Sequence, residues 1–259
     1  MKRRFIFLGI SGVVLVVVLS GLYYAFSQRS VATPGVVSEA TPNTLAPSGG
    51  FTLEEISPSD ILDSAPDISR GIRFSESIPQ EVRDILSKKA TEAVANIRAN
   101  PASGADWFNL ALYYHTANDY EGAREIWEFL TVVAPSNTVA FNNLGKLYHF
   151  SVPDFPKAEE YFMKSLAIDA ESLTPYVELF DLYRFSYKTD TTAAVDIMKK
   201  AMTIFPDNLD LFLALGAYYR DRGDTAQARS TFTNGLDKAR DAEDVGFIAS
   251  FGNELARIP

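Results

Sequence analysis

Apolar side chains recur every three or four positions from about residue 80 to the C-terminus, the spacing of helices that bury one face. The first such stretch begins after Pro79 and stops before the Asn100-Pro101 dipeptide. Four pairs of helical stretches follow. The chain ends in a one-sided apolar stripe formed by Ile248, Phe251, Leu255 and Ile258. The pattern predicts an all-α domain.

The four pairs repeat one another. Each begins with a large aromatic residue, at successive intervals of 34, 35 and 36 positions: Trp107, Phe141, Tyr176 and Phe212. The markers that follow in the first pair are Leu110, Ala111, Tyr114, Ala123, Trp127 and Pro135. The other pairs keep step with these markers, with one extra residue in the second and two in the third. In period and markers the chain resembles the tetratricopeptide repeat (TPR) family, membrane-anchored bacterial type.

The resemblance implies a TPR-like helical-hairpin solenoid of about four repeats. A leading half-repeat and a C-terminal capping helix complete it, and an N-terminal transmembrane helix precedes it. We expect an anchor at 1–27, a flexible Ser/Thr/Pro-rich linker at 28–78 and a TPR domain at 79–259. The repeats are expected near 104–137, 138–172, 173–208 and 209–240, with the capping helix at 241–257.

Small residues are expected where the two helices of a unit approach closely, and aromatic residues where neighbouring units meet. The small residues expected to face one another in pairs are Ala111 and Ala123, Gly145 and Ala158, and Gly216 and Ala228. Phe180 breaks this rule, because a bulky ring stands where the family has Gly or Ala. We therefore expect the third unit to be splayed.

The N-terminus carries a long uncharged apolar run, Phe5 to Phe26. At ~1.5 Å per residue this run matches a hydrocarbon core of ~30 Å. Basic residues at positions 2–4 precede it, which predicts a cytoplasmic N-terminus and an extracytoplasmic remainder in the cell (inner) membrane. The alternative is a signal peptide cleaved after Ser27, but the run exceeds the usual ~7–15 apolar residues.

Residues 28–52 have the Ser-, Thr- and Pro-rich composition of a flexible linker. Residues 53–78 differ, because apolar side chains are spread among acidic residues and prolines without a helical period. Two interpretations remain open: an irregular linker with a short helix near Ser59 to Ser64, or a segment that folds back along the repeats as an intramolecular ligand.

Composition narrows the possible chemistry. The chain has no Cys and a net charge of −9, which excludes disulfides and thiolate chemistry and disfavours nucleic acid as a partner. No phosphate-binding loop or hydrolase motif is present. The acidic pairs are expected to be solvated, and Trp107 and Trp127 to lie in the core. We expect neither an enzyme nor a cofactor nor a metal site.

One set of residues lies where the family resemblance implies a concave peptide-binding groove: Phe108, His115, Asn142, Lys146, His149, Val177, Asp181, Arg184, Leu213 and Arg220. Four of them directly follow the first-helix tyrosines and form a row in which all can be cationic: His115, His149, Arg184 and Arg220. Such a row would favour a ligand with carboxylates. The alternative is that these side chains have local partners such as Asp181 and Asp221.

The resulting hypothesis is a membrane-tethered scaffold or adaptor whose groove binds a partner protein or peptide in an envelope assembly. The alternative is a chaperone-like holder of translocating or unfolded polypeptides outside the cytoplasmic membrane.

Overall fold

The computed structural model describes residues 58–259, in which every regular element is a helix. The first two are α2 (Pro58–Ser64) and α3 (Gln80–Ala99). The helices of the four pairs are α4 (Gly104–Thr116), α5 (Tyr120–Val133), α6 (Thr138–Lys146), α7 (Phe155–Ile168), α8 (Leu173–Phe185), α9 (Ala193–Ile204), α10 (Leu209–Asp221) and α11 (Thr225–Asp241). A π-helical turn, η1 (Leu147–Ser151), extends α6, and α12 (Val245–Ala256) ends the chain.

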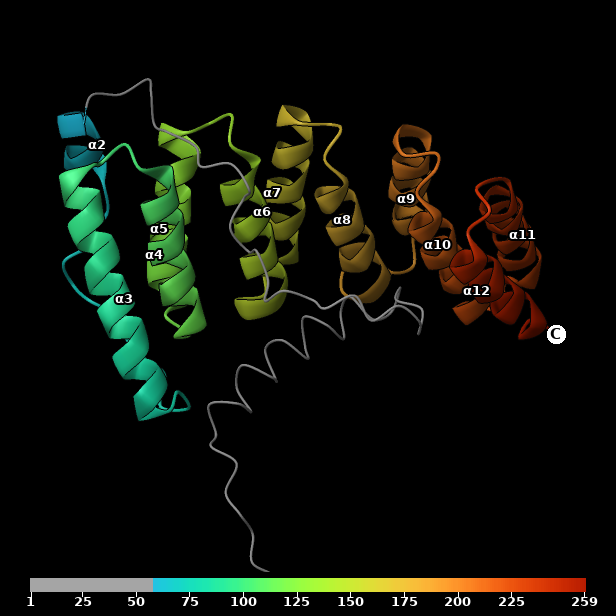
Figure 1. The fold of residues 1–259 in the computed structure, drawn as a ribbon, viewed down its shortest axis with the longest axis horizontal. Coiled ribbons are helices and arrows are strands. Elements are labelled where there is room, and N and C mark those ends of the chain that lie inside the picture. The colour runs from blue at the N-terminus through green and yellow to red at the C-terminus, as the bar shows by residue number, and fades with distance from the viewer. Residues whose placement is uncertain (1–57) are drawn as a thin grey trace, which may run out of the picture.

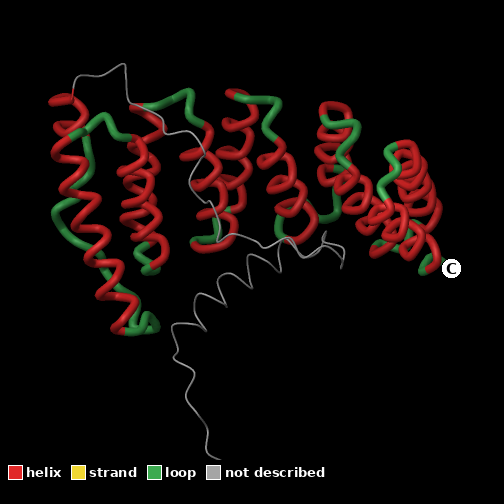
Figure 2. The backbone as a smooth tube through the Cα atoms, in the orientation of Figure 1, coloured by secondary structure: helices red, strands yellow, loops and turns green. Residues whose placement is uncertain are grey.

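Consecutive helices run in opposite directions and form a single row of hairpins (Figures 1 and 2). Within the row α4 packs on α5, α6 on α7, α8 on α9 and α10 on α11. Each hairpin also packs on the next, α3 packs on α4, and α12 packs on α11. The predicted all-α class is confirmed, and the described part of the chain is a tandem array of helical hairpins.

Short polar side chains begin most of these helices. At the N-caps of α5, α7, α11 and α12 an aspartate accepts a hydrogen bond from a first-turn N–H, and asparagine does so at α6 and α10. Such a bond satisfies an N–H that has no partner within the helix and contributes about 1 kcal/mol. Asp244, for example, accepts from the N–H of Phe247 at 3.0 Å and so begins the terminal helix.

Close helix contacts occur where the sequence has glycine. A Cβ added at Gly145 would lie 2.5 Å from the ring of Phe162, and one at Gly216 would lie 2.4 Å from that of Phe232. Neither distance leaves room for a methyl group. The expectation that small residues permit close approach is confirmed, although the nearest side chains are these rings rather than the alanines four positions earlier.

In the third hairpin the aromatic ring of this helix contact lies on the first helix instead of the second. Phe180 occupies the position of Gly145 and Gly216, and it is almost fully buried. On the facing helix Met198 occupies the position of the two phenylalanine rings. Because Met is unbranched and flexible, it leaves room for the ring opposite. The splay of this unit stays a prediction.

The extra residue of the second repeat is absorbed by η1. In this turn the N–H of Val152 donates to the carbonyl of Leu147 five residues earlier, at 2.9 Å. A π-helical turn of this kind accommodates one additional residue without ending the helix. His149 and Ser151 belong to this turn.

Residues 58–78 differ from the linker that the sequence predicted. The short helix expected near Ser59 to Ser64 is present as α2, but it is packed, with Ile61 fully buried. Ile78 is also buried, and Ile68 and Ile72 pack against the core. We call residues 65–79 the strap. It follows α2 and leads to the start of α3 (Figure 1), so apolar side chains without helical spacing still find a buried position here.

The terminal helix covers the last hairpin. Phe251 is fully buried and its ring lies against Gly235 of α11, where an added Cβ would approach it to 2.3 Å. Asp241, expected at the start of the capping helix, is instead the last residue of α11.

The anchor expected at 1–27 and the linker up to residue 57 lie outside the described residues. Among the helices from α2 to α12, none combines the length and the apolar character that crossing a membrane requires.

Candidate functional site

The first helices of the four hairpins carry all the candidate groove residues. Because these residues are spaced by three, four and seven positions within each helix, they lie on one side of it. We call the surface formed by this side of α4, α6, α8 and α10 the first-helix face. It comprises Phe108, Leu112, His115, Asn142, Lys146, His149, Val177, Asp181, Arg184, Leu213, Ala217 and Arg220.

Three apolar candidates belong mainly to the core. Phe108 and Leu213 are 4% and 9% exposed, so they present little surface to a ligand. Val177 is partly buried and packs against the core. The surface of the implied groove is therefore more polar than the residue types of the ten candidates suggest. What a ligand would contact there depends mainly on the charged candidates.

The two histidines of the row are hydrogen-bonded to serines of the next hairpin. His115 Nε2 lies 3.1 Å from Ser151 Oγ, and His149 Nε2 lies 3.0 Å from Ser186 Oγ. Burial lowers the pKa of both rings, that of His149 to about 4. Both are therefore neutral at pH 7. The expectation of a row of four cations is wrong at these two positions, because burial disfavours the charged form.

The two arginines of the row are ion-paired within the chain. Arg184 reaches Asp221 of the next hairpin at 2.9 Å. Arg220 pairs with Asp221 at 2.8 Å and also with Glu254 of α12. The alternative interpretation, in which the row has local partners, is confirmed for Asp221. A free cationic row that binds carboxylates is not what the structure contains.

Each row residue thus contacts a partner 34 to 37 residues further along, on the following first helix or at its end. The partners are Ser151, Ser186, Asp221 and Glu254. Sequence reasoning missed both serines and Glu254 as partners. A signal was present, because a short polar residue follows each of the next three row positions by one or two residues. These contacts connect neighbouring hairpins along the whole face.

The centre of the face holds two carboxylates on α8. Glu178 pairs with Lys146 of α6 at 2.9 Å. Asp181 is partly buried, and no described residue donates a hydrogen bond to its carboxylate or forms an ion pair with it. Burial, reinforced by the neighbouring Glu178 and opposed by Arg184, raises the pKa of Asp181 to about 7.

Unpaired amide atoms lie on the facing helix α6. Asn142 Oδ1 and Asn143 Nδ2 are buried and have no hydrogen-bond partner among the described residues. Both atoms are closed off from solvent, so in this conformation they are not accessible to another chain. Asp181 on α8 is therefore the polar group in the middle of the face that is partly exposed and has no partner among the described residues.

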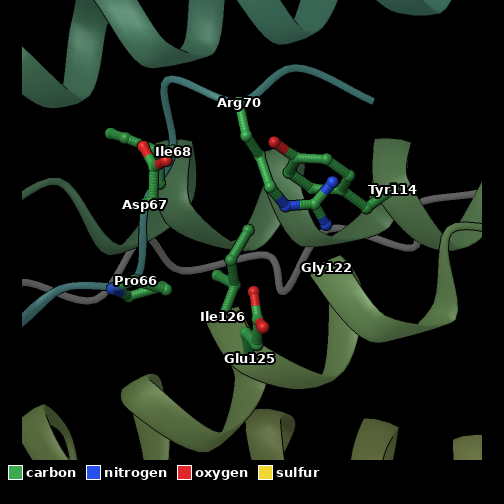
Figure 3. A pocket seen from close by; sticks show the side chains of 8 residues that line it. All are labelled: Pro66, Asp67, Ile68, Arg70, Tyr114, Gly122, Glu125 and Ile126. Carbon is green, nitrogen blue, oxygen red and sulfur yellow. The ribbon is translucent and has the colours of Figure 1, made fainter. Parts of the chain in front are cut away.

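A second feature is the contact between the strap and the first hairpin (Figure 3). Arg70 donates to Asp119 at 2.9 and 3.1 Å, and its guanidinium lies 4.8 Å from the centre of the Tyr114 ring. Asp119 also accepts from the backbone N–H of Arg73 at 2.7 Å and caps α5 through Gly122. Burial would raise the pKa of Asp119, but these hydrogen bonds together lower it.

The strap answers part of the question about residues 53–78. Its described part folds back onto the repeats, as one interpretation held, but at the turn between α4 and α5. Its hydrogen bonds to the first hairpin are with Asp119 and Ala117, neither of which is a candidate groove residue.

A third feature is a cleft of about 430 Å³ formed by α9, α10 and α11. Its lining is Lys199, Met202, Thr203, Phe212, Leu215, Tyr219, Gln227, Ser230, Thr231 and Asn234. Thr231 occupies the position at which the other second helices have Ile126, Tyr161 and Ile197. The cleft therefore follows from a short polar side chain where the other hairpins place a large one.

Other residues singled out in the sequence have structural roles. Trp107 is fully buried and its indole N–H donates to the carbonyl of Pro101 at 2.9 Å, and Trp127 is also buried. Glu159 accepts from Tyr183 and pairs with Lys188, each at 2.5 Å. Within residues 58–259 no three acidic or histidine side chains gather as a metal site would require.

Comparison with known proteins adds a single named likeness. No protein-family model matches the sequence, and no curated protein matches it. Sixteen chains of solved structures do match. One of them is the crystal structure of MamA. The alignment covers 62% of this chain and 97% of MamA, with 20% sequence identity and a TM-score of 0.48. At that level of similarity MamA indicates nothing about what this chain binds.

Proposed function

We propose that the chain is a scaffold that binds a segment of another protein on its first-helix face. The observation that supports this most strongly is the centre of that face. There, the carboxylate of Asp181 is partly buried, yet no described residue donates a hydrogen bond to it or forms an ion pair with it. Buried polar groups are normally paired, and an unpaired one destabilises the protein. A bound segment would supply the missing partner of Asp181.

The contacts between hairpins support the same role. They hold four successive first helices in fixed relation, so the face is pre-organised over the length of the array. Pre-organisation lowers the entropic cost of binding a long partner. Individual exposed ion pairs contribute only about 0–1 kcal/mol, so the row is better suited to fixing geometry than to stabilising the fold.

We further propose that the apolar run Phe5 to Phe26 anchors the scaffold in a cell membrane, with the hairpins on the extracytoplasmic side. The length and uncharged character of the run, and the basic residues before it, support this. The partner would then belong to an assembly of the envelope, close to the membrane. We propose no enzymatic activity, cofactor or metal for this chain.

A chaperone-like holder of unfolded chains is the weaker proposal. Such a protein needs a broad apolar surface for many sequences, whereas the row and its partners make the first-helix face polar. A face of paired charges fits a specific partner better.

Site-specific photocrosslinking of the full-length chain in membranes tests the scaffold proposal. A photoreactive amino acid would replace Ala217 on the first-helix face or, as the control, Val132, which is 74% exposed on the second helix α5. We expect a discrete crosslinked protein from Ala217 and none from Val132. Equal crosslinking from the two positions, or none from Ala217, would contradict the proposal.

A further inference from the structure

The charges of the first-helix face do not balance. Its three cations are Lys146, Arg184 and Arg220, and each is paired within the chain. Their partners are Glu178, Asp221 and Glu254. Asp181 is a fourth carboxylate, so this set of residues carries one more negative than positive charge when all are ionised. Both histidines of the row are neutral at pH 7 and do not compensate it.

The excess charge has a defined position. Asp181 lies on α8 one turn after Glu178 and one turn before Arg184, so its nearest cation on the same helix is the guanidinium that Asp221 holds at 2.9 Å. Across the face, Lys146 is 2.9 Å from Glu178. A partly buried carboxylate is stabilised when a cation pairs with it, and the described residues provide none for this one.

We propose that the partner segment carries a basic side chain, Lys or Arg, that binds the carboxylate of Asp181. This inference rests on the proposed function and specifies the chemistry of the partner at the same site. The sequence led us to expect a ligand with carboxylates, whereas this partner is basic. The reason is that the two histidines of the row are neutral and its two arginines are already paired within the chain. Val177 precedes Asp181 by one helical turn. On the next first helix, α10, Ala217 occupies the position that Asp181 has on α8. These apolar side chains suit the aliphatic stem of a long basic residue.

The test uses the full-length chain in lipid nanodiscs and a phage-displayed library of short linear peptides as the probe. We expect the selected peptides to share one basic residue. A synthetic selected peptide is then compared with the same peptide carrying norleucine at that position. Asp181→Asn should weaken binding of the basic peptide about tenfold or more, the usual effect of losing a charge-assisted hydrogen bond.

Two controls make the result specific. In Asp190→Asn a carboxylate whose side chain is 98% exposed is removed, and binding should stay unchanged. In a double-mutant cycle, norleucine in the peptide and Asn at position 181 should not weaken binding additively, because each removes the same contact. Thermal unfolding of the free Asp181→Asn protein establishes that it is folded.

The pH dependence provides a second readout. Affinity for the basic peptide should fall between pH 8 and pH 6, as the Asp181 carboxyl, whose pKa is about 7, takes up a proton. The other charged or titratable groups nearby are Lys146 on α6, His149 on η1, Glu178 and Arg184 on α8, and Arg220 and Asp221 on α10. Of the two histidines in the row, His149 stays neutral throughout this range.

The failures of the two proposals are distinguishable. If selected peptides lack a basic residue and Asp181→Asn leaves their affinity unchanged, yet Ala217→Trp abolishes it, the basic partner is overturned and the scaffold stands. If no peptide is selected, or Ala217→Trp leaves every selected peptide bound, the first-helix face is not the binding surface, and both proposals fail.

Discussion

Replacing Asp181 with Asn should stabilise the free protein, and more so at alkaline than at acidic pH. Burial raises the pKa of this carboxyl to about 7, whereas an aspartate in the unfolded chain has its ordinary value of 3.8. Between these values the folded state binds more protons than the unfolded state, so stability falls as pH rises. The destabilisation is complete above pH 7 and absent below pH 3.8. Asparagine keeps the shape of the side chain and does not titrate.

The magnitude follows from the two pKa values. A difference of about three units corresponds to about 4 kcal/mol as an upper limit, of which about 2–3 kcal/mol would appear between pH 5 and pH 8. Because Asp181 keeps some contact with solvent, we expect the wild type to lose about 1–3 kcal/mol more than Asp181→Asn over this interval.

Urea unfolding followed by circular dichroism at pH 5 and pH 8 measures this difference, with Asp190→Asn as the control that should match the wild type. Parallel pH profiles for the wild type and Asp181→Asn would refute the reasoning. They would mean that the Asp181 carboxylate is already solvated or paired in the free protein.

Three further predictions concern packing and the strap. Gly216→Ala should destabilise the protein by about 1–3 kcal/mol in urea unfolding, because the added Cβ would lie 2.4 Å from the Phe232 ring. The control is Gly252→Ala, which has open space around it and should be neutral or stabilising. Equal effects of the two substitutions would contradict the contact between Gly216 and Phe232. Asp119→Asn keeps an N-cap for α5 but removes the charge that binds Arg70. Hydrogen exchange should therefore accelerate in residues 66–78 and not in α8. Unchanged exchange would show that the strap does not depend on this pair. Thr231→Ile replaces a hydroxyl with an ethyl group and should occupy part of the cleft between α9 and α11, as Ile126 and Ile197 occupy the corresponding positions, and so raise stability by about 0.5–1.5 kcal/mol. A lower melting temperature would mean that the cleft cannot take the larger side chain.

The hairpin array could be predicted because its determinants are local and periodic. Trp107 and its three counterparts recur at nearly constant intervals, and the residues between them have the spacing of helices. Glycine at positions 145 and 216 likewise signals a close contact, although the sequence does not show that a phenylalanine ring provides the other side.

The chemistry of the face could not be predicted in the same way. Its positions followed from helical spacing, but the charge state of His149 depends on its burial in the folded array, and the pairing of Arg184 depends on a carboxylate 37 residues away. The strap was missed for a related reason. Ile68 and Ile72 pack against the core of the repeats without any helical period in their own segment.

Hydrogen exchange on the crosslinked complex tests the central claim most directly. The full-length chain, crosslinked to its partner in membranes, would be compared with the free chain. We predict slower exchange in the first helices α6 and α8, and no change in the second helices α5, α7 and α9. Protection confined to those second helices or to the strap would contradict a first-helix face that binds the partner.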